Sequence, residues 1–377
     1  MNHVAFIIPG LDRIGGAERQ VILLANGLKQ RGWRVSVVAL SGTGGTTAAD
    51  LTAAGIAFLT LEMRKGLADP RGWIRFHRWL KQESPDVIHA HLPHAVWFAR
   101  WSRLAAPIRV VIDTLHSSHT GSLGRRMGYR LSNWLPDEVT AVSHAVADAH
   151  LASKMADRIT VLPNGVDTDE WRPDPAARTS LRNELSLHDE FLWFAAGRLE
   201  PVKDYPTLLS ALAQLPPTAR LVIAGIGPCE SQLRQQSTAL NLDSRVHFLG
   251  FEPNVRRWMQ AADGFVLSSL WEGLPMALLE AAACGLPAVA TDVPGTREAV
   301  LEGRTGWLAP PRDPTALAEC MRMTMQTTAE ERTTIGNQAR QHMLDHFSLE
   351  TVLDRWEALY QHLLLSHPKP GRTGNAG

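Results

Sequence analysis

The stretch EGLPMALLEAAACGLP, residues 272–287, places one carboxylate before a predicted helix and a second carboxylate inside it. The preceding residues 264–269 (GFVLSS) predict a buried strand, and Pro275 suits the first turn of a helix. Glu272 therefore lies in a strand-to-helix loop, and in open α/β sheets such loops border the ligand crevice. Glu280 is flanked only by Ala and Leu, where a carboxylate costs free energy unless something pairs with it. We expect a ligand hydroxyl as its partner; the alternative is a half-exposed helix residue.

The fold class follows from strand-like apolar runs that alternate with helical patterns twice along the chain, which predicts two doubly wound α/β domains. A chain of 377 residues is also too long for one ordinary core. We expect a first domain over 1–168, a second over 169–347, a helix over 348–365, and a disordered tail rich in Pro and Gly over 366–377. The cleft between two such domains is the expected site. The predicted strands are 4–8, 35–40, 87–90, 110–115 and 138–142, then 191–196, 221–224, 246–249, 264–268 and 288–291.

Composition describes a soluble globular protein, with 45% hydrophobic and 20% charged residues and no apolar run long enough to span a bilayer. The first ten residues lack the basic start of a signal peptide, so we expect a cytoplasmic protein. Three scattered cysteines argue against a disulfide framework and a zinc site. Residues 1–168 hold 19 Lys and Arg against 13 Asp and Glu, which leaves 19 against 25 for 169–377, or +6 and −6. The basic first half could meet anionic lipid or an anionic acceptor, although this asymmetry alone decides nothing.

The spacing Glu272-x7-Glu280, after a strand ending in two serines and before Cys284-Gly285-Leu286-Pro287, resembles the nucleotide-sugar-dependent glycosyltransferases of family 4. The resemblance runs almost the whole length of the chain. It implies the GT-B fold, an α/β architecture of two Rossmann-like domains facing across a cleft, with a C-terminal helix that crosses back to the N-terminal domain. It also implies transfer of the sugar with retention at the anomeric carbon.

The same resemblance assigns roles to the two carboxylates. It implies that Glu280 binds the ribose hydroxyls of the donor nucleotide and that Glu272 lies near the donor sugar. Gly273 and Leu274, which follow Glu272, are then expected in the donor-binding site.

Two cations lie in the loop GRLEPVKD, residues 197–204, at the carboxyl end of the first strand of the second half. Arg198 offers a planar fork of donors and Lys203 a point charge, and both suit a diphosphate. The resemblance implies that they stabilise the departing nucleoside diphosphate, where charge builds up, and that Gly197 lies at the donor. The alternative is a pair of surface charges.

Three further loops offer backbone NH groups. The loop 10–18 (GLDRIGGAE) can hold an anion before a helix but is neither a dinucleotide fingerprint nor a P-loop. Gly15 and Gly16 resemble the glycine loop that approaches the donor phosphate and the acceptor, and a tight turn is the alternative. Gly225 is expected to lie near the base of the donor nucleotide, and the alternative is that it only forms a turn. Thr296 and its loop could cap the distal phosphate, although Pro294-Gly295 stands where many relatives have two glycines.

Histidines follow two of the predicted strands of the first half. His116 ends the strand 110–115 and resembles the family histidine that contacts the donor sugar near the reacting centre, and His119 lies close behind it. His89 and His91 alternate along one strand, but no carboxylate or Cys stands at metal-ligand spacing. We expect His91 and His119 to contact solvent or the acceptor, and His89 to be a hydrogen-bonded core residue.

A metal site is not expected. Residues 167–169 spell Asp-Thr-Asp, a pattern that binds a divalent metal in a different glycosyltransferase fold. Here the pattern follows Asn164-Gly165-Val166, where the resembling family has Asn-Gly-Val-Asp without metal. Because Arg198 and Lys203 can neutralise the diphosphate, we expect activity without a metal and without any cofactor.

Two segments mix aromatic or apolar residues with arginines, residues 71–81 and, more weakly, 125–130. Such a composition suits a helix at a membrane interface. In the first segment Trp73, Phe76 and Leu80 also form an ordinary core-facing stripe, and both alternatives stay open. Peripheral contact with the cytoplasmic membrane face is therefore a hypothesis.

The expected function is transfer of a hexose-type sugar from a nucleoside diphosphate, UDP before GDP, to a glycan or polyprenyl-linked acceptor. No nucleic-acid partner is expected. A bacterial surface-polysaccharide pathway is the setting suggested by analogy. Two rivals stay open: an epimerase of the same fold, and a non-catalytic subunit that binds nucleotide sugar within a glycosyltransferase complex. The epimerase would lack the two-glutamate spacing and would need acid and base pairs that the sequence does not offer.

Overall fold

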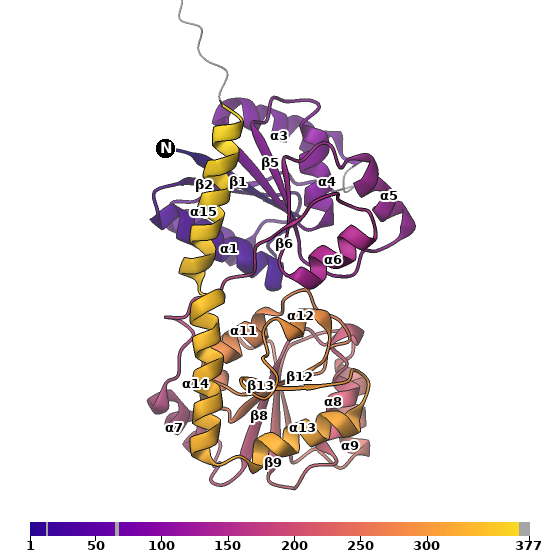
Figure 1. The fold of residues 1–377 in the computed structure, drawn as a ribbon, viewed down its shortest axis with the longest axis vertical. Coiled ribbons are helices and arrows are strands. Elements are labelled where there is room, and N and C mark those ends of the chain that lie inside the picture. Colours follow the sequence, from indigo (N-terminus) through magenta and orange to yellow (C-terminus); the bar gives the residue numbers. More distant parts are fainter. Residues whose placement is uncertain (13, 65–67, 369–377) are drawn as a thin grey trace, which may run out of the picture. The chain divides into compact units, whose positions relative to one another are not determined.

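The computed structural model describes residues 1–12, 14–64 and 68–368, and these form two compact units (Figure 1). Unit 1 comprises residues 1–165 together with the chain from residue 349 onward, and unit 2 comprises residues 166–348. Most of the expected disordered tail, residues 369–377, lies outside the described residues. Within the described chain, no helix is both long and apolar enough to cross a bilayer.

Unit 1 is built on a seven-stranded sheet of order β3-β2-β1-β4-β5-β6-β7, in which every neighbouring pair is parallel. Strand order reverses between β1 and β4, so the crevice of this sheet opens at the carboxyl ends of those two strands. The strands are β1 (His3–Ile8), β2 (Arg34–Ala39), β3 (Ala57–Thr60), β4 (Val87–His91), β5 (Val110–Leu115), β6 (Glu138–Ala141) and β7 (Thr160–Val161). The helices are α1 (Gly16–Gln30), α2 (Gly45–Ala53), α3 (Pro70–Glu83), α4 (Pro93–Ser102), α5 (Leu123–Leu131), α6 (His144–Ala152) and α15 (Leu349–Ser366).

Unit 2 repeats the plan with a six-stranded parallel sheet of order β10-β9-β8-β11-β12-β13. Its order reverses between β8 and β11. The strands are β8 (Phe191–Ala196), β9 (Ala219–Ala224), β10 (Val246–Gly250), β11 (Gly264–Leu267), β12 (Ala288–Thr291) and β13 (Gly306–Ala309). The helices are α7 (Pro175–Glu184), η2 (Pro201–Lys203), α8 (Tyr205–Leu212), α9 (Glu230–Ala239), α10 (Val255–Ala261), α11 (Met276–Ala283), α12 (Pro294–Arg297), α13 (Pro314–Gln326) and α14 (Ala329–His346).

The predicted strands are confirmed, mostly to within a residue or two at each end, but β3, β7 and β13 were not predicted. All three lie at an edge of their sheet, and each is four residues long or shorter. An edge strand is covered on fewer sides, so it needs no continuous apolar run. The sequence signal for these strands is weak for that reason.

The C-terminal helix α15 returns to the first-domain elements, as the sequence predicted, and packs beside α1 (Figure 1). Its buried residues Trp356 and Tyr360 join the apolar cluster that includes β1, β2 and α1. The Arg31 guanidinium donates to Asp354 and Glu357 at 2.6 Å each, and the Trp33 indole donates to Glu357 at 2.7 Å. The helix is thus held by a buried apolar face and by a rim of charged hydrogen bonds.

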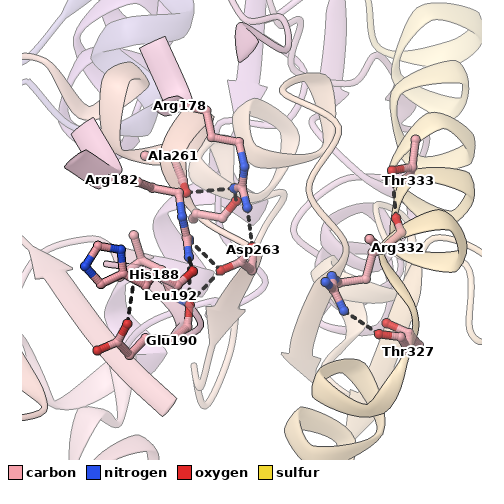
Figure 2. A network of polar contacts seen from close by, with 12 residues as sticks. Arg178, Arg182, His188, Glu190, Leu192, Ala261, Asp263, Thr327, Arg332 and Thr333 are labelled. Atoms are coloured by element: carbon pink, nitrogen blue, oxygen red, sulfur yellow. Dashed lines mark hydrogen bonds and ion pairs between the residues drawn. The ribbon is translucent and has the colours of Figure 1, made fainter. Parts of the chain in front are cut away.

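Asp263 fixes the start of β11 in unit 2 (Figure 2). Its carboxylate accepts from Arg178 at 2.5 Å and Arg182 at 2.9 Å, both on α7, and from the Leu192 NH of β8 at 2.8 Å. Arg178 also donates to the Ala261 carbonyl at 2.8 Å. This network ties α7 to the two central strands at the end opposite the crevice, and it thereby holds β11, the strand that leads into the loop of Glu272.

Replacing Trp356 by Ala tests the anchoring of α15. Trp356 is 1% exposed, so the cavity should lower the free energy of unfolding by about 3 to 5 kcal/mol, measured by urea denaturation. Leu365→Ala on the same helix is the control, because Leu365 is 82% exposed and should cost at most about 0.5 kcal/mol. Similar small losses for both variants would contradict the packing of α15 on unit 1.

Candidate functional site

The predicted donor-binding residues of unit 2 gather at the switch point of its sheet, the carboxyl ends of β8 and β11, where the strand order reverses. Gly197 and Arg198 follow β8, and the segment from Ser268 to Glu272 follows β11, the neighbouring strand. Leu270 NH donates to the Val202 carbonyl at 2.8 Å, which joins the two loops directly. Carboxyl ends of adjacent parallel strands meet at one edge, and this is why loops about 70 residues apart in sequence form one site.

Lys203 and Glu272 form an ion pair at the centre of this edge. The Lys203 ammonium donates to Glu272 Oε1 at 2.6 Å, and the side chains are 18% and 12% exposed. Ser269 donates to the same oxygen at 2.6 Å, and Ser268 donates to the Lys203 carbonyl at 2.7 Å. An ammonium group carries three donors, and the bond to Glu272 does not exhaust them.

Arg198 lies apart from this pair. Its side chain is 69% exposed and its guanidinium lies 2.8 Å from Glu200 in the same loop. The structure thus brings Lys203 to Glu272 but leaves Arg198 at the surface of the loop. An exposed ion pair of this kind holds a side chain only weakly, so Arg198 can exchange Glu200 for a more highly charged anion at little cost.

Two glycines permit the close approach of the loops. A Cβ on Gly225 would lie 1.9 Å from the Gly197 carbonyl oxygen, and a Cβ on Gly295 would lie 2.4 Å from the Gly273 carbonyl oxygen. Any side chain at either position would push the loops apart. Gly295, in the Pro-Gly pair that replaces two glycines, therefore serves the packing of the loop that carries Glu272.

Thr296 has a different place from the one predicted for its hydroxyl. The side chain is fully buried, and its hydroxyl lies 2.5 Å from the Thr291 carbonyl and accepts from the Val293 NH at 3.2 Å. The hydroxyl thus closes its own turn after β12 instead of being presented as a phosphate cap. Any phosphate contact of this loop would have to come from its backbone.

Glu280 lies in the second turn of α11 and is 3% exposed. It is the one charged residue of that helix, whose sequence is MALLEAAA. The pKa of the Cys284 thiol is raised to about 12, mainly by burial and secondly by the nearby negative charge of Glu280. The Arg340 guanidinium donates to the Ala283 carbonyl at 2.6 Å and so neutralises the C-terminal end of the helix. The structure thus places a deeply buried carboxylate in the second turn of the helix that follows the Glu272 loop. Leu274, in the connecting loop, is 4% exposed.

In unit 1 the predicted glycine loop follows β1 and leads into α1. Gly15 is the N-cap, and its NH donates to the Glu18 carboxylate at 3.0 Å. Gly16 is the first residue of the helix and is exposed. A carboxylate therefore already occupies one donor of this helix start, which reduces the positive potential available to a second anion.

Three histidines form a row along β4 and just after β5, in which His89 and His91 are fully buried and His116 is half-buried. His89 Nδ1 lies 2.7 Å from the Tyr360 hydroxyl and its Nε2 lies 2.6 Å from the Thr114 hydroxyl, so His89 is the hydrogen-bonded core residue that the sequence predicted. His91 Nδ1 lies 2.9 Å from His116 Nε2. Burial holds the pKa of all three imidazoles below its usual range, and for His116 at about 4. The row is therefore neutral at physiological pH.

His91 is fully buried, so a contact with solvent, one of the two predicted for it, is wrong, while its contact with the acceptor stays a prediction. Among the described residues its Nε2 has no hydrogen-bond partner. A buried N–H without an acceptor costs more than an unused lone pair, so we infer that His91 carries its proton on Nδ1 and donates it to His116 Nε2. His116 then holds its own proton on Nδ1 as a donor for a ligand oxygen. His119 is exposed, and its NH donates to Ser117 at 3.1 Å.

Two residues of the site were missed by sequence reasoning, Ser269 and Tyr205. Ser269 orients Glu272, and the spacing Ser-x-x-Glu, familiar from helix starts, is the signal that could have found it. The Tyr205 hydroxyl donates to the Gly197 carbonyl at 3.3 Å. Burial, and next the charge of Glu272, raises the pKa of Tyr205 above its usual range, so the phenol stays a neutral donor. No local pattern marks it.

The Asp-Thr-Asp pattern forms a turn. The Asp167 carboxylate accepts from the backbone NH groups of Asp169 at 3.0 Å and Glu170 at 2.9 Å. Within the described residues, no group of three or more His, Cys, Asp or Glu is placed to hold a metal ion.

Comparison with known families matches nearly the whole chain in two parts. The sequence model of the glycosyl transferases group 1 matches residues 177–342, and that of glycosyltransferase family 4 matches residues 14–170. The N-acetyl-alpha-D-glucosaminyl L-malate synthase of Bacillus anthracis is 27% identical over 298 residues, 75% of this chain and 76% of that protein. An Escherichia coli enzyme, the UDP-Gal:alpha-D-GlcNAc-diphosphoundecaprenol alpha-1,3-galactosyltransferase, is 28% identical over 259 residues, 64% of this chain and 67% of that protein.

Solved structures match the fold. The Anabaena protein HepE in complex with UDP-glucose superposes with a TM-score of 0.84 at 25% identity, covering 95% of this chain and 99% of that one. The sucrose-phosphate synthase of Thermosynechococcus elongatus gives a TM-score of 0.84 at 21% identity, covering 97% and 100%. The expected GT-B fold class is confirmed.

The lowered pKa of His116 in the histidine row predicts a stability that depends on pH. The pKa of His116 is lower in the folded chain than in the unfolded chain, so the unfolded chain binds more protons between about pH 4 and 6.5. The free energy of unfolding should therefore be constant above about pH 6.5 and fall as the pH is lowered below it. Urea denaturation between about pH 7.5 and 5 should show a shallower fall for His116→Gln than for the wild type, whereas His247→Gln, at an exposed site, should keep the wild-type slope. Equal slopes for all three would mean that His116 titrates normally in the folded protein.

Proposed function

The chain belongs to the family 4 glycosyltransferases of group 1, and from this premise we propose that it transfers a hexose-type sugar from a UDP-sugar to a glycan or lipid-linked glycan acceptor. The observation that carries the proposal is the Lys203–Glu272 pair at the switch point of unit 2, with the buried Glu280 in the second turn of the following helix, α11. HepE is solved with UDP-glucose, and the related Escherichia coli enzyme is named for UDP-galactose and a diphosphoundecaprenol-linked acceptor. These names favour UDP over GDP and an acceptor carried on a lipid.

In the proposed reaction the site stabilises the leaving group electrostatically. Lys203 and Arg198 neutralise the charge that builds up on the departing diphosphate; Lys203 is already held in place by Glu272, whereas Arg198 exchanges Glu200 for the diphosphate. Glu280 accepts hydrogen bonds from the ribose hydroxyls, and Glu272 holds Lys203 while it accepts from the donor sugar. His116 donates its Nδ1 proton to a sugar oxygen and stays neutral throughout.

We propose retention of the anomeric configuration by front-face attack. The acceptor hydroxyl attacks C1 on the face from which the diphosphate leaves, and a phosphate oxygen takes the acceptor proton. This course suits a site in which the anionic side chains are already engaged as ligands of Lys203 and of the nucleotide. The reaction is proposed to need no metal, because two cationic side chains stand at the loop that meets the diphosphate.

The acceptor is proposed to bind in unit 1, in a hollow of about 340 Å³ at the starts of α4 and α5. The hollow is lined by His94, Trp97 and Arg125, among others. An aromatic face beside a guanidinium suits a sugar ring that carries a phosphate. We propose a cytoplasmic enzyme of bacterial surface-glycan synthesis, acting on acceptors at the membrane.

Thermal unfolding with UDP, GDP and ADP tests the donor site. UDP at about a hundred times its dissociation constant should stabilise the protein by about 2.7 kcal/mol, and the shift should survive EDTA. Glu280→Gln should weaken UDP binding about 10- to 100-fold, because it removes a charged acceptor, whereas Glu319→Gln on the exposed face of α13 should not. No shift with any nucleotide would support a non-catalytic subunit, and a shift abolished by EDTA would contradict the metal-free proposal.

His116→Ala separates turnover from donor binding. It should lower kcat about 10²- to 10³-fold, as expected for one lost transition-state donor, while the UDP-induced thermal shift stays unchanged. His247→Ala, at an exposed site in unit 2, is the control for kcat. Unchanged turnover in His116→Ala would remove this residue from the reaction.

A further inference from the structure

Of the two segments rich in arginine and apolar residues, α3 turns its apolar side inward. Phe76 is 1% exposed and Leu80 is 8% exposed. Trp73 and Phe76 contact Phe98 of α4 with ring centroids 4.4 and 5.0 Å apart. The core-facing alternative therefore holds for this helix, whose one exposed large apolar residue is Ile74, at 51%.

The other segment, α5, does the opposite. Leu123, Met127 and Leu131 recur at every fourth position and are 70%, 44% and 66% exposed. Trp134, just after the helix, is 70% exposed. Positions four apart lie on one face of a helix, so these residues form a continuous apolar stripe that points away from the core. Figure 1 shows α5 at the outside of unit 1, on the side away from α15.

The inner side of α5 is firmly anchored, so the stripe is a fixed surface. Arg100 of α4 is fully buried and donates to the Tyr129 carbonyl at 3.1 Å and to the Ser132 hydroxyl at 2.8 Å. Its other end is paired with the buried Asp113 at 2.6 Å. Tyr129 is 2% exposed. The helix therefore cannot turn its leucines inward without exposing Tyr129 and breaking the buried hydrogen bonds from Arg100 to Tyr129 and Ser132.

The charges on α5 itself are of one sign, and the nearby exposed Asp157 accepts from Asn133 at 2.8 Å. Arg125, Arg126 and Arg130 lie on α5, and residues 123–136 contain no Asp or Glu. The next acid, Asp137, accepts from Arg103 at 2.5 Å and so is already paired. An apolar stripe, three arginines and a tryptophan at one surface match the composition of helices that lie in a membrane interface.

We propose that α5 and the turn through Trp134 form a docking surface for the anionic face of a lipid bilayer. Leu123, Met127 and Leu131 enter the boundary between headgroups and acyl chains, and the arginines contact lipid phosphates. A second copy of the chain is a poorer occupant, because a twofold interface would bring the same arginines together with no acid on the helix to pair them. The proposal is independent of the transferase activity, since it concerns binding without donor or acceptor.

Sedimentation of the full chain with vesicles tests this surface. The protein should bind vesicles that contain phosphatidylglycerol far better than vesicles of phosphatidylcholine alone, and the binding should weaken at high salt. Leu131→Ser should lower the partition coefficient about tenfold, and Arg126→Gln with Arg130→Gln more than tenfold. Ile74→Ser, an exposed apolar position on α3, is the matched control and should bind as the wild type does.

Size-exclusion chromatography with light scattering and thermal unfolding complete the test. All the substituted positions are exposed or half-buried, so the variants should keep the wild-type Tm. Wild-type protein that ignores anionic vesicles, or Leu131→Ser protein that binds them equally well, would overturn the proposal. A wild-type dimer that Leu131→Ser converts to monomers would also overturn it and would assign the stripe to contact between copies.

Discussion

A pair of parallel strands cannot be joined by a tight turn, and both units of this protein obey that constraint throughout. Each strand must be followed by a crossover, usually a helix, before the next strand begins at the same end of the sheet. All carboxyl ends therefore meet at one edge. The loops carrying Gly197 and Glu272 in unit 2, and Gly15 and His116 in unit 1, lie at such edges because of this geometry. The candidate site residues therefore lie mainly in the loops after the strands, whose sequences are less constrained by packing than those of the strands.

The cost of burying polar groups explains how the two edges differ. In unit 2 the charge of Lys203 is compensated by that of Glu272, and Arg340 donates to the Ala283 carbonyl at the end of the helix that holds Glu280. In unit 1 the row of histidines avoids the cost by staying neutral, as the lowered pKa of His116 indicates. One edge thus offers charges suited to a diphosphate, and the other offers a neutral donor suited to a sugar hydroxyl. This division is what a transferase needs if only its leaving group is strongly charged.

The same cost accounts for the surface of α5. Apolar side chains that remain exposed while their helix is anchored by Arg100 have no route into the core. A lipid-linked acceptor would be presented at a membrane surface, and a protein that docks there meets its acceptor at a high local concentration. The proposed docking surface and the hollow at the starts of α4 and α5 share Arg125, so one element would serve both contacts.

The sequence by itself determined the alternation of strands and helices, the loops that end at the crevice, and the residue types suited to a diphosphate and a ribose. These features are local. Apolar residues repeat with a period of two in strands and 3.6 in helices, and glycine or proline marks a turn, so neighbouring residues are enough to reveal them. Only the tertiary structure decided that His91 is buried behind His116, that Lys203 meets Glu272, and that Thr296 closes its own turn. It also decided that α3 faces inward and α5 outward, although both sequences are amphipathic. The physical reason is that periodicity defines which face of a helix is apolar, whereas the partner of that face comes from residues far away in the chain.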